Sequence, residues 1–214
     1  MASAACTNAC SGPWPRAVAE LPLFPLRTVL FPGGLLPLRI FETRYVDMVS
    51  RCMREGIEFG VLLIRDVDSA ESGPVSALAG IGTSARIVDF NALPDGLLGL
   101  MCRGARRFRL LSHRLQSDGL HVGSVEWLDE PPPSALTPDH RPLARVLRRV
   151  LRELGDTARH LDADFEDAGW VSNRLAEFLP LERDAQQQLL EQGDAQERMR
   201  ALAPLIEVPP EGRE

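Results

Sequence analysis

The chain contains no lysine, since all 24 basic residues among its 214 are arginine. This absence excludes several kinds of chemistry. A phosphate-binding loop of the Gly-x-x-x-x-Gly-Lys type needs a lysine ammonium, and a Ser-Lys hydrolase needs an amine that can lose its proton near neutral pH. A guanidinium stays charged in proteins and cannot take that second role. Schiff-base chemistry is excluded as well, because it needs a primary amine as the nucleophile.

Excess positive charge and long apolar runs are also missing. The formal net charge is -6 and the pI is near 5.3, which argues against a general affinity for nucleic acid or for anionic membranes. No uninterrupted apolar run approaches the roughly 18 residues that a membrane-spanning helix requires. Residues 1–17 lack the basic and apolar regions of a secretory signal. We therefore expect a cytoplasmic protein, with disordered tails at 1–17 and 207–214.

Metal and disulfide patterns are not recognisable. Cys6 and Cys10 form a lone Cys-x3-Cys pair, and the other two cysteines lie within apolar patterns. The four histidines are scattered, with no His-Glu-x-x-His spacing. No Gly-x-Ser-x-Gly, paired-carboxylate or Cys-His arrangement can be assembled either. The sequence predicts no catalytic residue, no metal and no cofactor.

Two motifs match known ligand loops only superficially. Residues 80–85 fit the Gly-x-Gly-x-x-Ala fingerprint of dinucleotide sites, but a strand and a turn follow where the phosphates require a helix N-terminus. Residues 162–173 begin like a calcium loop, but Asp167 replaces the required glycine and Asn173 the bidentate glutamate. We interpret the acidic run as the solvated start of a helix.

Residues 18–129 have the pattern of a small, mostly antiparallel, barrel-like sheet. Four prolines between residues 20 and 41 predict kinked edge strands and loops. One helix is expected from Thr43, as the cap, to Gly56, with Tyr45, Val49, Cys52 and Met53 on its buried face. A buried strand at 58–66 and a long loop at 66–79 should follow. Two hairpins turn at residues 94–96 and 117–119.

The rest of the chain reads as helical. Five prolines in residues 130–142 predict a stiff linker. Apolar residues then recur with helical period at 143–154, with Pro142 in the first turn and Gly155 at the end. Further helices are expected near 166–179, after Pro180, and after an Asp194 cap, so residues 143–206 should form a four-helix bundle. The predicted fold class is α+β.

Two groups of residues are candidates for binding. The arginine-rich run has two interpretations: a contact for phosphate or an acidic peptide, or the polar face of a strand paired with carboxylates of the acidic helical part. Its candidate site residues are Arg103, Arg107, Phe108 and Arg109. Leu35 and Leu36 either lie at an exposed loop tip that binds a partner or belong to the core.

Five motifs together resemble the amino-terminal substrate-binding domain of Lon proteases. The stretch ELPLFPLRTVLFPGGLLPLRIFETRY is similar to the opening of that domain, and GTSARI, LPDG and RGARRF follow in the same order as its strand, turn and strand motifs. The segment from LAEFLPLERD to RMRALAPLI is similar to the helices that close the family's globular unit. The resemblance covers about residues 18–206.

The resemblance implies a PUA-like pseudo-barrel followed by a helical bundle. It also implies a non-catalytic module that recognises unfolded polypeptide or a partner protein, including a Lon-type protease. From the length and the missing lysine we expect neither the ATPase nor the Ser-Lys protease domain of that family. The alternatives are an RNA-binding PUA-like protein and a small-molecule or enzymatic pocket between barrel and bundle. The sequence does not predict the oligomeric state.

Overall fold

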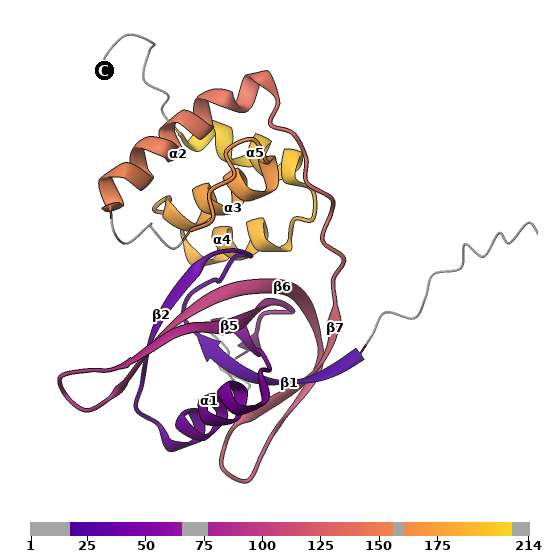
Figure 1. Ribbon diagram of the computed structural model, residues 1–214. Coiled ribbons are helices and arrows are strands. Elements are labelled where there is room, and N and C mark those ends of the chain that lie inside the picture. The colour runs from indigo at the N-terminus through magenta and orange to yellow at the C-terminus, as the bar shows by residue number, and fades with distance from the viewer. Residues whose placement is uncertain (1–17, 66–76, 156–160, 207–214) are drawn as a thin grey trace, which may run out of the picture.

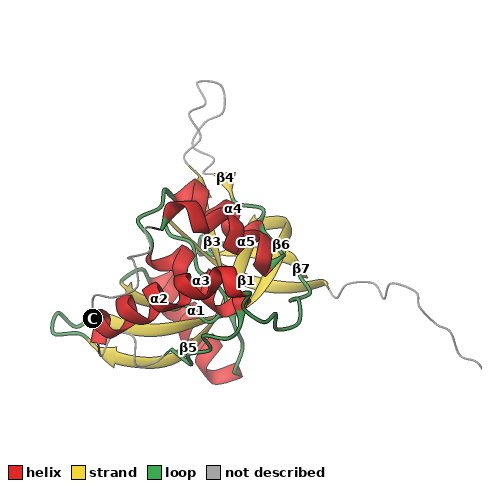
Figure 2. Ribbon diagram, turned by 90° about the horizontal axis from the view of Figure 1, so that it is seen from above, coloured by secondary structure: helices red, strands yellow, loops and turns green. Residues whose placement is uncertain are grey.

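The computed structural model describes residues 18–65, 77–155 and 161–206. A strand-rich half is followed by a helical half, and α1 lies on the opposite side of the sheet from the other helices (Figure 1). Seen from above, the C-terminal helices cover the strands (Figure 2). The predicted α+β class is therefore confirmed. Both predicted tails and most of the predicted loop at 66–79 lie outside the described residues.

The strands form a closed barrel with two additions. They are β1 (Val18–Leu26), β2 (Leu35–Ile40), β3 (Phe59–Arg65), β4 (Ala77–Leu78), β5 (Ile81–Ala92), β6 (Leu98–Leu115) and β7 (His121–Trp127). The pairing runs β1-β7-β6-β5-β3, and β3 pairs back onto β1. All these contacts are antiparallel except β1 with β3, which is parallel. β2 adds to β6, and β4 adds to β3 at the end of the region predicted to be a loop.

The prediction that the proline-rich start forms edge strands is wrong for β1. This strand pairs with β7 through residues 18–23 and with β3 through residues 23–26, so it closes the barrel. Its prolines each fall where the strand has one paired neighbour, with Pro22 opposite Val122 of β7 and Pro25 opposite Leu62 of β3. β2 pairs with one neighbour, β6, among the described residues, and it carries Pro37; such an edge strand is the usual place for proline in a sheet.

The two predicted hairpin turns are confirmed. Gly96 and Gly119 have φ of 79° and 80°, the left-handed region that glycine enters without steric cost. Gly96 ends the turn between β5 and β6, and Gly119 lies in the turn between β6 and β7. The long β6 strand therefore forms one hairpin with β5 and another with β7, which places it at the centre of the sheet.

Helix α1 (Thr43–Glu55) ends at the predicted residue but begins one residue earlier than predicted. Gly56 terminates it with φ of 66°. The cap position is Glu42 rather than Thr43, and Met48 takes the buried place predicted for Met53, which is exposed. The helix therefore starts at the residue expected to be its cap, one residue earlier than predicted. Tyr45, Met48, Val49 and Cys52 form a buried stripe at i, i+3, i+4 and i+7, and Met53 lies outside it.

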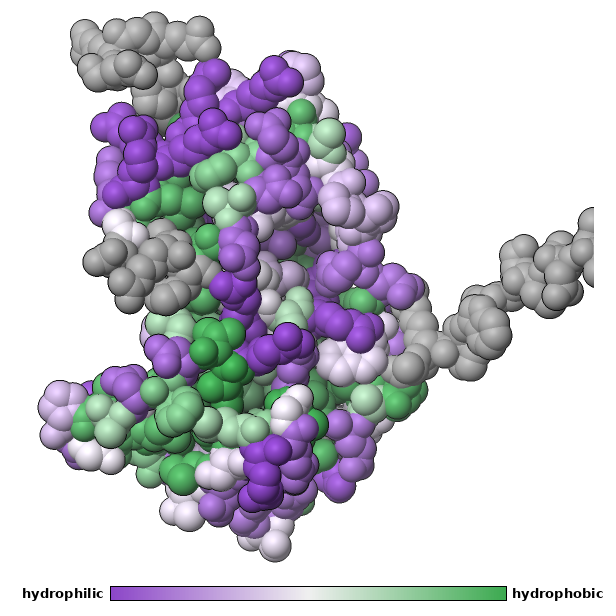
Figure 3. All heavy atoms as spheres, in the orientation of Figure 1, coloured by the Kyte–Doolittle hydropathy of each residue, from purple (hydrophilic) through white to green (hydrophobic). Residues whose placement is uncertain are grey.

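The four predicted C-terminal helices are all present: α2 (Arg141–Leu154), α3 (Ala168–Phe178), α4 (Arg183–Glu191) and α5 (Ala195–Leu202). Asp194 caps α5 as expected, accepting hydrogen bonds from the N–H groups of Gln196 and Glu197. The acidic run supplies the cap of α3 through Asp167. The side of α2 turned away from the bundle is hydrophilic (Figure 3). On their inner sides, the four helices pack around one shared apolar core.

The barrel and the bundle share a packed junction. Phe31, from the loop between β1 and β2, is completely buried in the helical core. The buried Arg174 guanidinium donates to the Pro32 carbonyl oxygen at 3.0 Å, and the Gln187 side chain donates to the Ile81 carbonyl oxygen at 2.9 Å. The proline-rich linker is also attached, since the Leu136 N–H donates to the Glu166 carbonyl oxygen at 2.9 Å. These bonds fix the two halves against each other.

Candidate functional site

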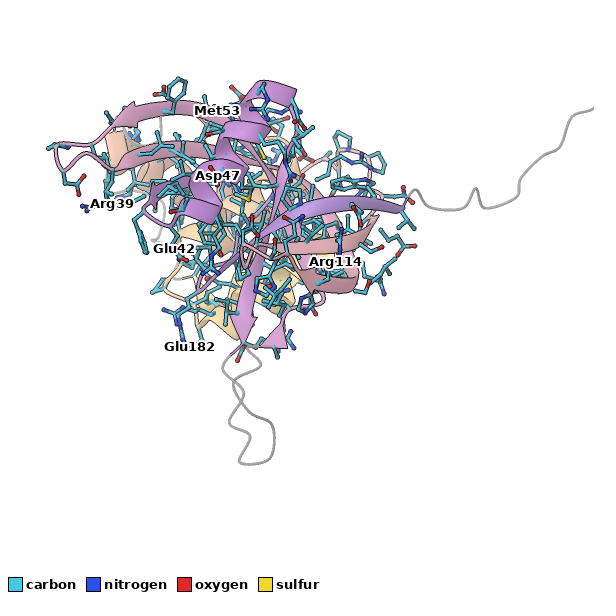
Figure 4. The ribbon with its side chains drawn as sticks, turned by 90° about the horizontal axis from the view of Figure 1, so that it is seen from below. Arg39, Glu42, Asp47, Met53, Arg114 and Glu182 are labelled. Atoms are coloured by element: carbon cyan, nitrogen blue, oxygen red, sulfur yellow. The ribbon has the colours of Figure 1, made fainter. Side chains whose placement is uncertain are left out.

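An apolar groove of about 750 Å³ crosses the end of the barrel near the start of α1. It is lined by the end of β1, the end of β2 and the segment leading into α1, together with the hairpin between β6 and β7. Figure 4 views this end of the molecule, with Arg39 and Glu42 on one side and Arg114 on the other. With Ile64 of β3 and Leu78 of β4 also in the lining, segments far apart in the sequence therefore meet at one surface.

The floor of the groove is apolar and well packed. The rings of Phe24 and Tyr45 stack with their centroids 4.0 Å apart, and Ile40 lies beside them in the barrel core. Burial raises the pKa of Tyr45 above 10.0, so its hydroxyl stays neutral in the physiological range. Leu26 and Leu38 are only partly buried and lead from this core toward the opening. The floor thus offers apolar surface that the fold itself does not cover.

Two large apolar side chains stand exposed at the rim. Phe41 is 71% exposed and Leu115 is 61% exposed, and both line the groove. Each lies at a strand end, Phe41 directly after β2 and Leu115 as the last residue of β6. Exposed apolar residues scattered singly are normal in soluble proteins, whereas these two border the same apolar groove. The rim therefore extends the apolar floor to the surface.

The charged residues of the rim are held by neighbours. Arg44 forms an ion pair with Glu42 and donates to the Gly119 carbonyl oxygen at 3.1 Å. Arg114 lies 3.2 Å from Glu20, and Arg39 pairs with Asp95. These pairs orient the long side chains around the opening, so the groove has a polar border of fixed shape around an apolar floor, as binding pockets commonly have.

Two histidines form the remaining wall. The Nδ1 atoms of His113 and His121 are 3.4 Å apart, across β6 and β7. Burial, then the nearby charges of His113 and Arg44, lower the pKa of His121 below 6.5. His121 is therefore neutral at pH 7, which keeps this wall compatible with an apolar ligand.

The residues predicted as a loop tip lie in a strand. Leu35 and Leu36 belong to β2, where they pair with Arg103 and Cys102. Leu36 is buried in the barrel core, and Leu35 is half-buried at the start of the strand. The turn that precedes them uses Gly33 with φ of 74°, so the chain reverses before the leucines rather than at them. Of the two alternatives, the structure therefore favours the core for Leu36, and neither leucine lies at a loop tip.

The structure shows what the arginine-rich run contacts inside the molecule. Arg103 pairs with Asp162, Arg107 with Glu130 at 3.0 Å, and Arg109 with Glu126 at 3.6 Å. One of these carboxylates comes from the helical part, one from the linker and one from β7. Phe108 is completely buried in the barrel. The positive charge on which the RNA-binding alternative rested is thus engaged within the protein.

A β-bulge explains why the arginine-rich run does not place its arginines on one solvent-exposed face of β6. The register of β5 with β6 shifts between Thr83 and Ala85, and there the Arg106 N–H donates to the Ser84 hydroxyl at 3.1 Å. Arg106 turns outward and its guanidinium stacks on Trp127, 4.7 Å from the ring centroid. Arg107 is covered by the helical part instead of facing water.

The groove was not among the sequence predictions. Its residues carry no motif of known chemistry, although residues 24–26 and 38–45 lie in the stretch that resembles the opening of the Lon domain, and none of the six predicted site residues lines it. The signal in the sequence is weak: one large apolar residue stands directly after a strand in Arg39-Ile40-Phe41, and another stands directly before a turn in Arg114-Leu115-Gln116. Only the closed barrel brings these positions together.

The fold and the groove define a class of protein: a β-barrel with a docked helical bundle that offers a binding surface. The family model described as the ATP-dependent protease La (LON) substrate-binding domain matches residues 20–208. The chain belongs to this family, and the matched domain is non-catalytic.

Curated relatives of the chain are Lon proteases as well. The Lon protease of Paraburkholderia phytofirmans is 32% identical over 187 residues, which cover 83% of this chain and 23% of that protein. The Lon protease of Anaeromyxobacter dehalogenans is 27% identical over 194 residues, covering 88% of this chain and 23% of that protein. The chain therefore spans less than a quarter of the length of these relatives.

Solved structures show the same fold. The Lon N-terminal domain protein from Xanthomonas campestris is 40% identical, with a TM-score of 0.73 over 88% of this chain and 99% of that one. The N-terminal domain of Mycobacterium avium complex Lon protease, at 18% identity, has a TM-score of 0.58 over 87% of this chain and 97% of that one. Among the described residues, no helix is both long and apolar enough to cross a membrane.

Proposed function

We propose that the chain binds segments of non-native polypeptide through the groove at the end of the barrel. The observation that carries this proposal is the pairing of an open apolar groove with Phe41 and Leu115, which stand 71% and 61% exposed at its rim. Unfolded chains expose apolar side chains that native proteins bury, and a groove of this size can take a few of them. The family match supports a polypeptide ligand.

The binding energy should come from the two rim residues and the floor beneath them. Fully burying a large apolar side chain contributes about 1.5–3 kcal/mol. Phe41 and Leu115 together can therefore account for more than one tenfold step in affinity, at about 1.4 kcal/mol per step. The polar border would set the direction of the bound segment rather than its affinity.

The experiment is a fluorescence anisotropy titration with a labelled, permanently unfolded polypeptide, reduced and carboxymethylated α-lactalbumin. The double variant Phe41→Ser/Leu115→Ser should bind at least about tenfold more weakly than the unmodified chain. The matched control is Phe90→Ser, because Phe90 is also aromatic and exposed (55%) but lies outside the groove. Equal affinity for the unmodified chain and the double variant would refute the proposal.

A second arm asks which kind of polypeptide is bound. The same titration is repeated with native α-lactalbumin and with a folded Lon-type protease. Binding of the unfolded form alone supports the proposal as stated. Binding of the folded protease that is lost in the Phe41→Ser/Leu115→Ser variant assigns the groove to a partner protein instead.

A further inference from the structure

A second pocket lies between the barrel and the bundle. Its volume is about 280 Å³, which suits a ligand of only a few atoms. The loop after β1, one residue of β6, the proline-rich linker, helices α3 and α5 and the loop before α5 surround it. It is independent of the groove, because the two share no lining residue.

Two buried arginines face this pocket. Arg107 is 4% exposed and Arg198 is 5% exposed, and both line the cavity. Arg107 uses Nε for the Glu130 carboxylate and Nη1 for the Leu190 and Gln192 carbonyl oxygens, at 2.9 Å and 3.3 Å. Among the described residues, nothing accepts a hydrogen bond from its Nη2.

Arg198 has no carboxylate in ion-pair contact among the described residues. Its Nε donates to the Ser172 hydroxyl at 2.9 Å and its Nη1 to the Gln192 carbonyl oxygen at 2.7 Å. Both acceptors are neutral, and within the described ranges Nη2 again has no acceptor. Burial, followed by the charge of Arg107, lowers the pKa of Arg198 to about 10, against the opposing charges of Glu130, Asp167 and Asp194. A buried cation beside another cation is costly unless an anion accompanies it.

The carboxylates that line the pocket are already engaged. Glu130 accepts from both the Nε and the backbone N–H of Arg107. Asp167 accepts from the Ser134 N–H at 2.9 Å and from the Trp170 N–H at 2.8 Å, as the cap of α3. Glu130 Oε1 and both carboxylate oxygens of Asp167 already accept hydrogen bonds from these donors. The two Nη2 groups have no acceptor among the described residues.

We propose that this pocket binds a small oxyanion, held between the Nη2 groups of Arg107 and Arg198. Planar guanidinium groups form charge-assisted hydrogen bonds with phosphate and carboxylate oxygens. The bound anion would join a β6 side chain to an α5 side chain, so it would bridge the barrel and the bundle. Its site includes Arg107, which the sequence marked as a candidate for phosphate contact, but in a buried rather than a surface position.

The test is a titration of the full chain with inorganic phosphate at constant ionic strength, adjusted with sodium chloride. Trp170 lines the pocket, so its fluorescence reports occupancy, and a Trp170→Phe variant identifies its part of the signal. The unmodified chain should give a saturable change, and Arg198→Gln should weaken binding at least about tenfold. Acetate as a separate probe distinguishes a phosphate group from a carboxylate.

A second variant guards against misfolding of Arg198→Gln. Gly193 lines the pocket, and a Cβ there meets nothing within 4 Å. Gly193→Asp should therefore fold normally but repel the anion, whereas Gly193→Ala should bind phosphate as the unmodified chain does. A response equal to that with chloride alone, or unchanged phosphate affinity in Gly193→Asp, overturns the proposal.

Discussion

Replacing Gly104 of β6 with alanine should push the loop that carries Phe31 away from β6, and so loosen the contact between the barrel and the bundle. A Cβ on Gly104 would lie 2.2 Å from the Phe31 carbonyl oxygen, whereas ordinary contact begins near 3.4 Å. The loop carrying Phe31 must therefore move by the difference, 1.2 Å. That loop is held to Gly104 by two hydrogen bonds of 2.8 Å, from the Gly33 N–H to the Gly104 carbonyl oxygen and from the Gly104 N–H to the Gly34 carbonyl oxygen.

The expected loss follows from these contacts. Two backbone hydrogen bonds contribute about 1 kcal/mol each, and overpacking a close-packed site costs about 1–3 kcal/mol. Gly104→Ala should therefore lower the free energy of unfolding by about 3–5 kcal/mol. Phe31 makes the effect cooperative, because it is completely buried in the helical core and moves with the loop.

Urea denaturation followed by circular dichroism measures the change, with Gly80→Ala as the matched control. Gly80 has open space at its Cβ position and no positive φ, so alanine is tolerated there. Both variants remove the same unfolded-state freedom of glycine, and their difference isolates the clash. A free energy of unfolding for Gly104→Ala within about 1 kcal/mol of that of the control, at equal m, would refute the reasoning.

Three further predictions concern titration, thiol reactivity and capping. Because the pKa of His121 is lowered in the folded state, the unfolded chain binds more protons just below 6.5, so the unfolding free energy should fall as pH drops through that value. Urea titrations at about pH 7.5 and about pH 5.5 should show a smaller fall for His121→Gln; an equal fall would contradict this. Burial, then the nearby Cys52, raises the pKa of Cys102 to about 12, so iodoacetamide at about pH 8 should modify it only after unfolding in urea, as peptide mapping would show; modification at equal rates in both states would count against it. Asp194→Ala should cost about 0.5–2 kcal/mol through loss of the α5 cap, and an unchanged urea midpoint would exclude that role.

The helices and hairpins could be predicted from local sequence because their causes are local. The apolar period from Leu143 to Leu154, the Asp194 cap and the glycines at 56, 96 and 119 each act within a few residues. Even there the start of α1 differs from the prediction by one residue, because Glu42 rather than Thr43 is its cap. Such details depend on how the helix packs rather than on its period.

Long-range contacts, which local sequence does not encode, decide where the predicted binding residues lie. Leu36 and Phe108 look like exposed apolar residues in a proline-rich or arginine-rich context, but long-range pairing buries both. Arg107 carries a charge that usually lies at the surface, and only the bundle packed on β6 explains its burial. The groove was missed because Phe41 and Leu115 are 74 positions apart in the sequence.

By itself the sequence determined the α+β order, the turns, the helix stops and the absence of lysine chemistry, because each depends on residue type or on a short repeat. The tertiary structure decided the rest. Closure of the barrel requires β1 to pair with β3, residue 23 beside residue 60, a contact that no local pattern encodes. That closure and the docking of the bundle create the apolar groove at one end of the barrel and the arginine-lined pocket at the junction, where side chains from distant segments converge.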